Sequence, residues 1–227
     1  MATVLLVRHG LTKMTGPVLA GWTPGVHLDE RGQAQATALA ERLAEVPVTA
    51  IVSSPLERCQ ETAAALAAGR EVAVQTDDRL GECQYGDWTG QELKKLAKDP
   101  LWKVVQAHPS AAAFPGGEAL RDTQARAVGA VRDHNARLGD DATWIAVSHG
   151  DVIKSLVADA LGLHLDLFQR IQIDPCSLTV VRYTTLRPFV LRLNDTGGGV
   201  DDLKPPKRRR STRRSSDAAV GGGAGSA

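Results

Sequence analysis

The chain has 227 residues, 43% of them hydrophobic, and its 27 Lys and Arg residues nearly balance its 26 Asp and Glu residues, for a net charge of +1. It has no run of about 20 apolar residues and no cationic segment before its first apolar run, so neither a membrane span nor a secretory signal is expected. Cys59, Cys83 and Cys176 are widely spaced and form no CxxC pattern, which favours reduced thiols in a cytoplasmic protein over a disulfide framework or a zinc site.

The first 90 residues alternate apolar, strand-like runs with helix-like segments. In chain order they predict a strand, a helix, a strand, a helix, a strand and a polar loop, at residues 3–7, 31–44, 49–54, 55–67, 71–76 and 77–90. Asp29 is a suitable N-cap for the first helix, and Pro55 suits the first turn of the second.

The alternation continues to about residue 193. The order predicted is helical pieces, a loop followed by a long helix, a strand, a helix and two closing strands, at residues 91–107, 114–138, 143–150, 151–161, 178–183 and 189–193. Apolar strands interleaved with helices predict an α/β fold. We expect a three-layer αβα arrangement, with a mainly parallel central sheet and helices on both faces.

The C-terminal segment differs in composition from the body. Asp195–Ala227 is rich in Gly, Pro, Ser and Arg and carries seven basic and four acidic residues, whereas Met1–Asn194 carries 20 basic and 22 acidic residues. The segment has too little apolar surface to offset its ordering entropy, so we expect a domain at 1–194 and a disordered basic tail at 195–227. The run KPPKRRRSTRR has prolines and no interleaved aromatics. It predicts weak, salt-sensitive binding of polyanions rather than specific nucleic-acid or membrane binding.

Polar residues follow three of the predicted strands and occupy the loop after another. Because ligands of such folds bind at the carboxyl ends of parallel strands, we expect these residues to converge at one edge of the sheet. The candidates are Arg8, His9 and Gly10 after the first strand, Arg58 after the second, Glu82 in the loop after the third, and His149 and Gly150 at the end of the fourth.

This set of residue types suits phosphoryl transfer. Two guanidinium groups can grip phosphate oxygens, a neutral imidazole can attack phosphorus, and a carboxylic acid can protonate the leaving oxygen. Gly10 would let the backbone approach the phosphate, and helix N-termini after Gly10 and Gly150 would add N–H donors. A metal site of His9, His149 and Glu82 lacks the close spacing of metal motifs and has two arginines beside it. We therefore expect no metal and no cofactor.

The chain resembles the histidine phosphatase superfamily, which includes the cofactor-dependent phosphoglycerate mutases. The resemblance rests on seven segments in the family's order, which together cover nearly all of Met1–Asn194. They are LLVRHGLT (5–12), GW (21–22), LDERGQAQA (28–36), SSPLERCQETA (53–63), LGECQYGDWTG (80–90), FPGGEAL (114–120) and VSHGDVIK (147–154).

The resemblance implies a role for each matching residue. His9 would be the phosphorylated nucleophile and Glu82 the proton donor, and Arg8, Arg58 and His149 would clamp the phosphate. Thr15, Gly21 and Trp22 are further expected contacts of the substrate or phosphate, with Gly10 and Gly150. Two positions depart from the family pattern: Leu11 stands where Glu or Gln is usual, and Thr15 stands where an asparagine is usual, so that a hydroxyl donor replaces an amide donor.

Alternatives remain at this stage. The preferred interpretation is a metal-independent phosphatase of a small phosphorylated metabolite, with a homodimer as one possible assembly. A phosphomutase would return the phosphoryl group to a substrate hydroxyl, and a phosphate-binding adaptor would do no chemistry. Cys83 and Gln84 follow Glu82 where phosphoglycerate mutases carry an arginine, which favours the phosphatase. Each site residue taken alone could be structural, and Trp22, Tyr85 and Trp88 could line the pocket or belong to the core.

Overall fold

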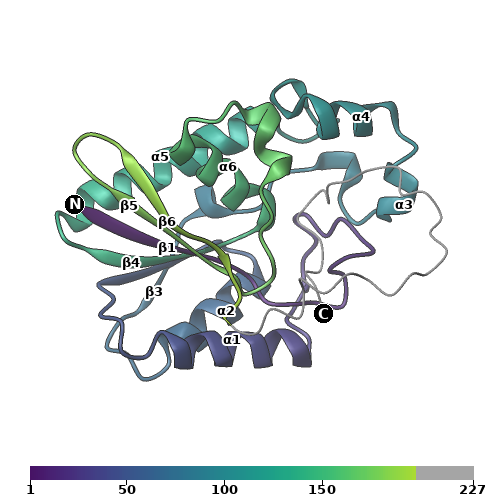
Figure 1. The fold of residues 1–227 in the computed structure, drawn as a ribbon. Helices are drawn as coiled ribbons and strands as arrows, with labels where there is room; N and C mark the ends of the chain where they lie inside the picture. The colour runs from purple at the N-terminus through teal and green to yellow at the C-terminus, as the bar shows by residue number, and fades with distance from the viewer. Residues whose placement is uncertain (198–227) are drawn as a thin grey trace, which may run out of the picture.

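A computed structural model describes residues 1–197, and its centre is a six-stranded mixed sheet (Figure 1). The strands lie in the order β3-β2-β4-β1-β5-β6, with the first four parallel and with β5 and β6 antiparallel to their neighbours. Their bounds are β1 (Ala2–Arg8), β2 (Ala50–Ser53), β3 (Val74–Thr76), β4 (Thr143–Ser148), β5 (Leu178–Tyr183) and β6 (Pro188–Asp195). The expected α/β fold with a mainly parallel sheet is confirmed.

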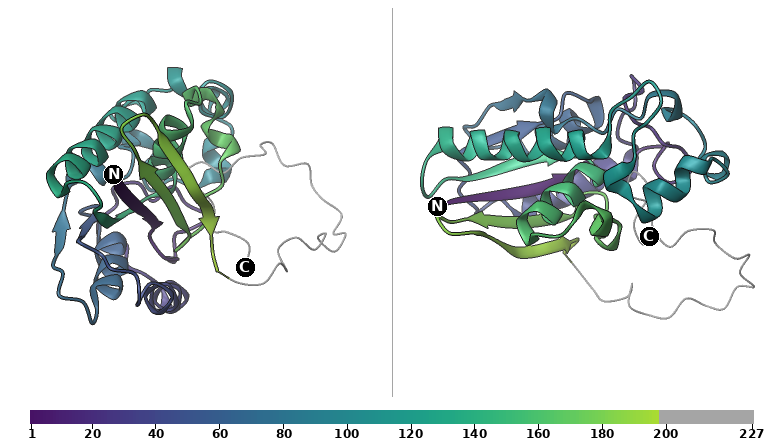
Figure 2. Two further views of the ribbon diagram at one scale, coloured as in Figure 1. Left: turned by 60° about the vertical axis from the view of Figure 1, so that its left-hand side comes forward. Right: turned by 90° about the horizontal axis from the view of Figure 1, so that it is seen from above.

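Helices cover both faces of this sheet. Figures 1 and 2 show α5 (Leu120–Leu138) and α6 (Gly150–Leu161) on one face, with α1 (Glu30–Arg42) and α2 (Glu57–Ala67) on the other. Two short helices, α3 (Leu93–Leu96) and α4 (Pro100–Ala107), lie beyond the edge where β1 ends (Figure 1).

The alternation of side chains along the strands produces these layers. In β1, Val4 and Leu6 pack into the core on the α5 and α6 side, whereas Leu5 and Val7 pack into the core on the α1 and α2 side. A continuous apolar run therefore gives a strand that is buried on both faces. Asp29 caps α1 as expected, because its carboxylate accepts a hydrogen bond from the backbone N–H of Gly32 at 2.9 Å.

Several boundaries differ from those expected. No helix follows Gly10, since the next helix is α1, which starts only at Glu30. Pro55 precedes α2 and its N-cap residue Leu56 instead of lying in the first turn. The third strand shortens to β3, and 3₁₀ turns at 78–80 and 86–88 interrupt the expected loop.

The C-terminal boundary also moves slightly. Asp195, expected in the tail, belongs to β6, and its carboxylate pairs with Arg42 of α1 at 3.0 Å and with Arg192 at 2.8 Å. The expected disorder and polyanion binding of the tail concern residues that, beyond Gly197, lie outside the described part of the chain.

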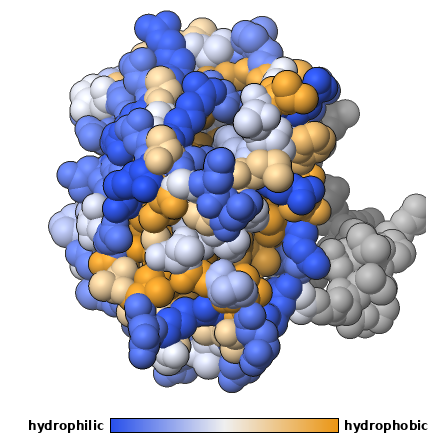
Figure 3. Space-filling view, turned by 90° about the vertical axis from the view of Figure 1, so that its left-hand side faces the viewer, coloured by the Kyte–Doolittle hydropathy of each residue, from blue (hydrophilic) through white to orange (hydrophobic). Residues whose placement is uncertain are grey.

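The two ends of the sheet differ in character. Arg8 and Ser148 pair at the carboxyl ends of β1 and β4, where the polar residues singled out in the sequence gather. The opposite end faces the viewer in Figure 3, where hydrophilic side chains surround smaller groups of hydrophobic ones. Within residues 1–197, no helix combines the length and the apolar character that crossing a membrane requires.

Candidate active site

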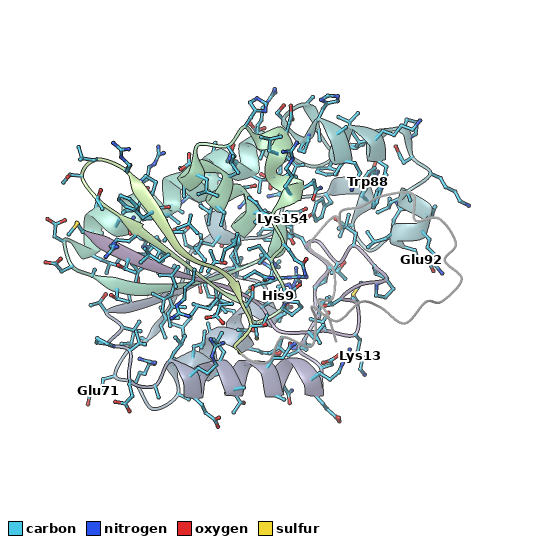
Figure 4. The ribbon with its side chains drawn as sticks, in the orientation of Figure 1. His9, Lys13, Glu71, Trp88, Glu92 and Lys154 are labelled. Atoms are coloured by element: carbon cyan, nitrogen blue, oxygen red, sulfur yellow. The ribbon has the colours of Figure 1, made fainter. Side chains whose placement is uncertain are left out.

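Five side chains from four segments converge at the carboxyl edge of the sheet. Arg8 ends β1 and His9 follows it, Arg58 lies in the first turn of α2, Glu82 lies in the loop before α3, and His149 caps α6. All five are buried, with exposed fractions between 0% and 6%. Figure 4 shows His9 near the end of β1, with Lys154 of α6 above it and Lys13 farther out.

The environment of His9 defines its tautomer. Its Nδ1 lies 2.8 Å from the carbonyl oxygen of Gly10, which can only accept, so Nδ1 carries the proton and Nε2 keeps its lone pair. Arg58 Nε donates to this Nε2 at 3.3 Å. Burial, and after it the charges of Arg58 and Arg8, lower the pKa of His9 well below its usual value. The ring is therefore neutral at neutral pH, which is the form that attacks an electrophile.

The two buried arginines supply positive charge beside His9. Arg8 Nη1 donates to the carbonyl oxygen of Ile173 at 2.8 Å, and Arg58 Nη2 donates to that of Gly21 at 2.8 Å. Arg58 Nη1 has no hydrogen-bond partner within residues 1–197. A buried guanidinium donor without an acceptor is costly, and a phosphate oxygen would satisfy it.

His149 is fully buried and packs against His9, with ring centroids 5.2 Å apart in an edge-to-face arrangement. Arg58 Nη2 lies 3.3 Å from its Nδ1, and arginine can only donate, so Nδ1 is the acceptor. Its Nε2 then carries the proton and donates to the Ser54 hydroxyl at 2.8 Å. Burial, followed by the Arg58 charge, lowers the pKa of His149 well below its usual value. Both histidines are therefore neutral at neutral pH.

Glu82 provides a proton donor and acceptor. Its Oε1 accepts a hydrogen bond from the Cys83 backbone N–H at 3.0 Å, and its Oε2 lies 3.9 Å from His149 Nδ1. Burial, and then the negative charge of Asp151, raise the pKa of Glu82 to about 7. Because His149 is neutral, this contact is not an ordinary ion pair. A carboxyl group with such a pKa can give and take a proton near neutral pH.

Asp151 is a site neighbour that the sequence analysis missed. It is the second residue of α6 and is fully buried, its Oδ2 accepts a hydrogen bond from the Tyr85 hydroxyl at 2.8 Å, and its Oδ1 lies 3.5 Å from Lys154 Nζ. It lies two residues after His149, so the position of Ser148-His149-Gly150 at a strand end was a signal that could have found it. Tyr85 and Trp88 both pack in the hydrophobic core, and the Tyr85 hydroxyl at the same time reaches Asp151.

The three predicted glycines have structural tasks. A Cβ on Gly10 would lie 2.6 Å from the carbonyl oxygen of Gly32, so Gly10 allows close contact with α1, and its N–H donates to Thr62 Oγ1 at 3.2 Å. This packing is a structural reason for a glycine at position 10, and the expected phosphate contact of Gly10 stays a prediction. Gly21, with a φ of +51°, presents its carbonyl to Arg58. The helix N-terminus expected after Gly150 is present, one residue earlier, because Gly150 is the first residue of α6.

Two other predicted contacts lie around the five side chains. The Thr15 hydroxyl bonds that of Thr12 at 2.9 Å and closes a local turn. The Trp22 indole Nε1–H donates to the carbonyl oxygen of Glu82 at 2.6 Å, so Trp22 contacts the backbone of the Glu82 loop. Cys59 lies 3.4 Å from His149 Nε2, but burial raises the pKa of its thiol to about 12. Its thiol therefore stays protonated at neutral pH and is a poor nucleophile.

Known proteins resemble this chain in sequence and in fold. Phosphoserine phosphatase 1 of Hydrogenobacter thermophilus is 30% identical over 202 residues, which span 86% of this chain and 93% of that protein. Among solved structures, YhfR of Bacillus stearothermophilus has a TM-score of 0.78 at 30% identity, covering 86% of this chain and 98% of that one. A mycobacterial glucosyl-3-phosphoglycerate phosphatase, in complex with VO₃, has a TM-score of 0.77 at 28% identity, covering 85% and 99%.

The family model of the histidine phosphatase superfamily (branch 1) matches residues 4–196, nearly the whole described part of the chain. Phosphatases are among the relatives matched over most of this length. The chain therefore belongs to branch 1 of the histidine phosphatase superfamily and is an enzyme of the phosphatase class.

Proposed function

We propose that the protein is a metal-independent phosphatase that hydrolyses small phosphate monoesters through a phosphohistidine on His9. The observation that carries the proposal is the state of His9. Its ring is neutral, its Nε2 is unprotonated and accepts only a 3.3 Å hydrogen bond from Arg58 Nε, and burial and the charges of two buried arginines lower its pKa. Glu82, a carboxyl group of pKa about 7, lies 3.9 Å from the neighbouring His149. The oxygens of a phosphate monoester bound there would lie beside positive charge, and its phosphorus would lie beside a nucleophile.

The proposed reaction has two transfers. In the first, His9 Nε2 attacks phosphorus, the bond from phosphorus to the leaving oxygen breaks, and that oxygen takes the proton of Glu82. In the second, Glu82 takes a proton from water, the resulting hydroxide oxygen attacks phosphorus, and the N–P bond breaks. Inorganic phosphate leaves, and His9 and Glu82 return to their starting states. Arg8 and Arg58 would neutralise the phosphoryl oxygens throughout.

The names of two relatives support the substrate class. One is named for phosphoserine and the other for glucosyl-3-phosphoglycerate, both of which are small phosphate monoesters. A third relative, 31% identical over 188 residues, is named a probable phosphoglycerate mutase. A phosphomutase is therefore the second candidate function. Beside Glu82, however, Cys83 is buried and Gln84 is uncharged, so neither residue offers a guanidinium to a substrate carboxylate.

One experiment separates the two candidates. The purified protein is incubated with p-nitrophenyl phosphate, with phosphoserine and with 3-phosphoglycerate, the last also in the presence of 2,3-bisphosphoglycerate. We expect phosphate release at mildly acidic to neutral pH and little conversion of 3- to 2-phosphoglycerate. Conversion well above the rate of phosphate release would overturn the phosphatase proposal and favour the mutase.

A further inference from the structure

Arg126 of α5 holds the loop that carries Glu82. Its guanidinium donates to three carbonyl oxygens of that loop, those of Arg79 at 2.7 Å, Gly81 at 2.9 Å and Glu82 at 2.9 Å. Its remaining donors reach the carboxylate of Glu118 at 2.6 Å and 3.1 Å. These five hydrogen bonds equal the number of N–H donors that an arginine has. Arg126 is thus fully committed to one loop and one carboxylate.

Glu118 fastens the same loop from the other side. Its Oε1 accepts a hydrogen bond from the backbone N–H of Gln84 at 2.9 Å, and its own N–H donates to the Gln84 carbonyl oxygen at 2.8 Å. The ion pair with Arg126 therefore holds in place the Glu118 carboxylate, which in turn binds the loop backbone at Gln84. The side chains of Arg126 and Glu118 are 20% and 16% exposed, so solvent competes weakly for these bonds.

The carboxyl group of Glu82 depends on this support. Within residues 1–197, the only hydrogen bond to the carboxyl oxygens of Glu82 comes from the backbone N–H of Cys83, which belongs to the same loop. Its carbonyl oxygen, in contrast, accepts from both Arg126 and Trp22. The position of the carboxyl group is therefore set through the backbone, and a displacement of about 1 Å can cost on the order of 100-fold in rate.

We propose that Arg126, braced by Glu118, is a positioning residue for the proton donor Glu82. It fixes the backbone from Arg79 to Glu82 so that the carboxyl group stays within reach of the leaving oxygen. The inference rests on the proposed role of Glu82. It adds that the proton transfer depends on a residue of α5 that need not touch the substrate.

A leaving-group comparison distinguishes positioning from general structural damage. Phenolate is strongly basic and needs a proton as it leaves, whereas 2,4-dinitrophenolate is stable without one. A misplaced proton donor therefore slows the cleavage of phenyl phosphate far more than that of 2,4-dinitrophenyl phosphate. Damage to the nucleophile or to the phosphate clamp would slow both substrates alike.

The experiment measures kcat/KM for both substrates, together with the thermal midpoint, because kcat/KM reports on the first transfer alone, whereas Glu82 also acts in the second transfer, which is the same for both substrates. The variants are Arg126→Gln, Arg126→Lys and Glu118→Gln, with Glu82→Gln as comparator and Arg121→Gln as control, because Arg121 is on the same helix and 71% exposed. We expect Arg126→Gln to lose about 100-fold with phenyl phosphate and less than about 10-fold with 2,4-dinitrophenyl phosphate. Arg126→Lys keeps the positive charge but lacks the planar fork, so it should lose less activity than Arg126→Gln without reaching that of the wild type. Arg121→Gln should match the wild type.

The outcomes separate the two levels of the proposal. If Glu82→Gln is selective for the poor leaving group but the Arg126 and Glu118 variants slow both substrates equally, the positioning role is wrong and the role of Glu82 stands. If Glu82→Gln itself slows both equally, the proposed role of Glu82 fails, and the inference fails with it. Should Arg126→Gln not fold, Glu118→Gln and Arg126→Lys decide by the same criterion.

Discussion

His9 and Glu82 are buried in the same site, and burial moves their pKa values in opposite directions. It lowers the pKa of His9 and raises that of Glu82 to about 7, because a low-dielectric environment disfavours the charged form of each group. The result is a neutral imidazole in the same site as a carboxyl group that still holds its proton at mildly acidic pH. The two states that the proposed first transfer requires therefore exist together over one range of pH.

The pH profile tests the electrostatic part of this pairing. The first transfer needs protonated Glu82, so kcat/KM should fall as pH rises through about 7. The charge of Asp151 raises the pKa of Glu82, so Asp151→Asn should lower that pKa and shift the alkaline limb to lower pH. Asp122→Asn, on the exposed face of α5, should leave the limb in place. An unchanged limb in Asp151→Asn would contradict the account.

At the scale of elements, the turn after β1 lies directly against α1. A Cβ on Gly10 would lie 2.6 Å from the Gly32 carbonyl oxygen, and a Cβ on Gly32 would lie 2.1 Å from that of Leu11. The backbone that presents His9 is thus packed on the helix with no room for a methyl group on either side. This contact replaces the helix N-terminus that was expected after Gly10.

Urea unfolding of glycine variants tests this contact. Gly10→Ala should lower the free energy of unfolding by about 1–3 kcal/mol, because the added methyl group meets backbone that cannot give way. Gly129→Ala is the matched control, since a Cβ there meets nothing within 4 Å in the middle of α5. It should raise the free energy of unfolding by about 0.5–1 kcal/mol through helix propensity. Equal effects at the two positions would show that the contact is not close.

Local patterns in the sequence predicted most elements and the convergence of five site residues. Strand and helix periodicity, the Asp29 cap and the polar strand ends are all readable within short windows. The contacts of Arg126 are not, because its partners lie as many as 47 positions away and nothing near it in sequence marks its role. The turn after Gly10 was mispredicted for the same reason, since packing against α1, not local propensity, determines it.

At the scale of the whole molecule, the fold concentrates buried cations at one edge of the sheet. Arg8 and Arg58 come from different segments and meet beside His9 only in the folded chain. The expected homodimer and cytoplasmic location remain predictions from the sequence. In the proposed mechanism, these two guanidinium groups supply the positive charge that a metal would otherwise provide.

Chelation tests that assignment. Incubation with excess EDTA followed by an assay with p-nitrophenyl phosphate should leave kcat/KM unchanged, because the two guanidinium groups remain in place. Dialysis against buffer without EDTA is the control. Complete loss of activity on chelation, with recovery on adding Mg²⁺ or Zn²⁺, would show that a metal ion is required.

In the proposed mechanism, the phosphoryl group passes through His9. The most direct measurement is to quench the enzyme during turnover of a ³²P-labelled monoester and to locate the label on the chain. The account predicts an acid-labile, base-stable phosphoprotein labelled at His9, and neither label nor turnover in a folded His9→Ala variant. A label on serine, or full activity in His9→Ala, would contradict it.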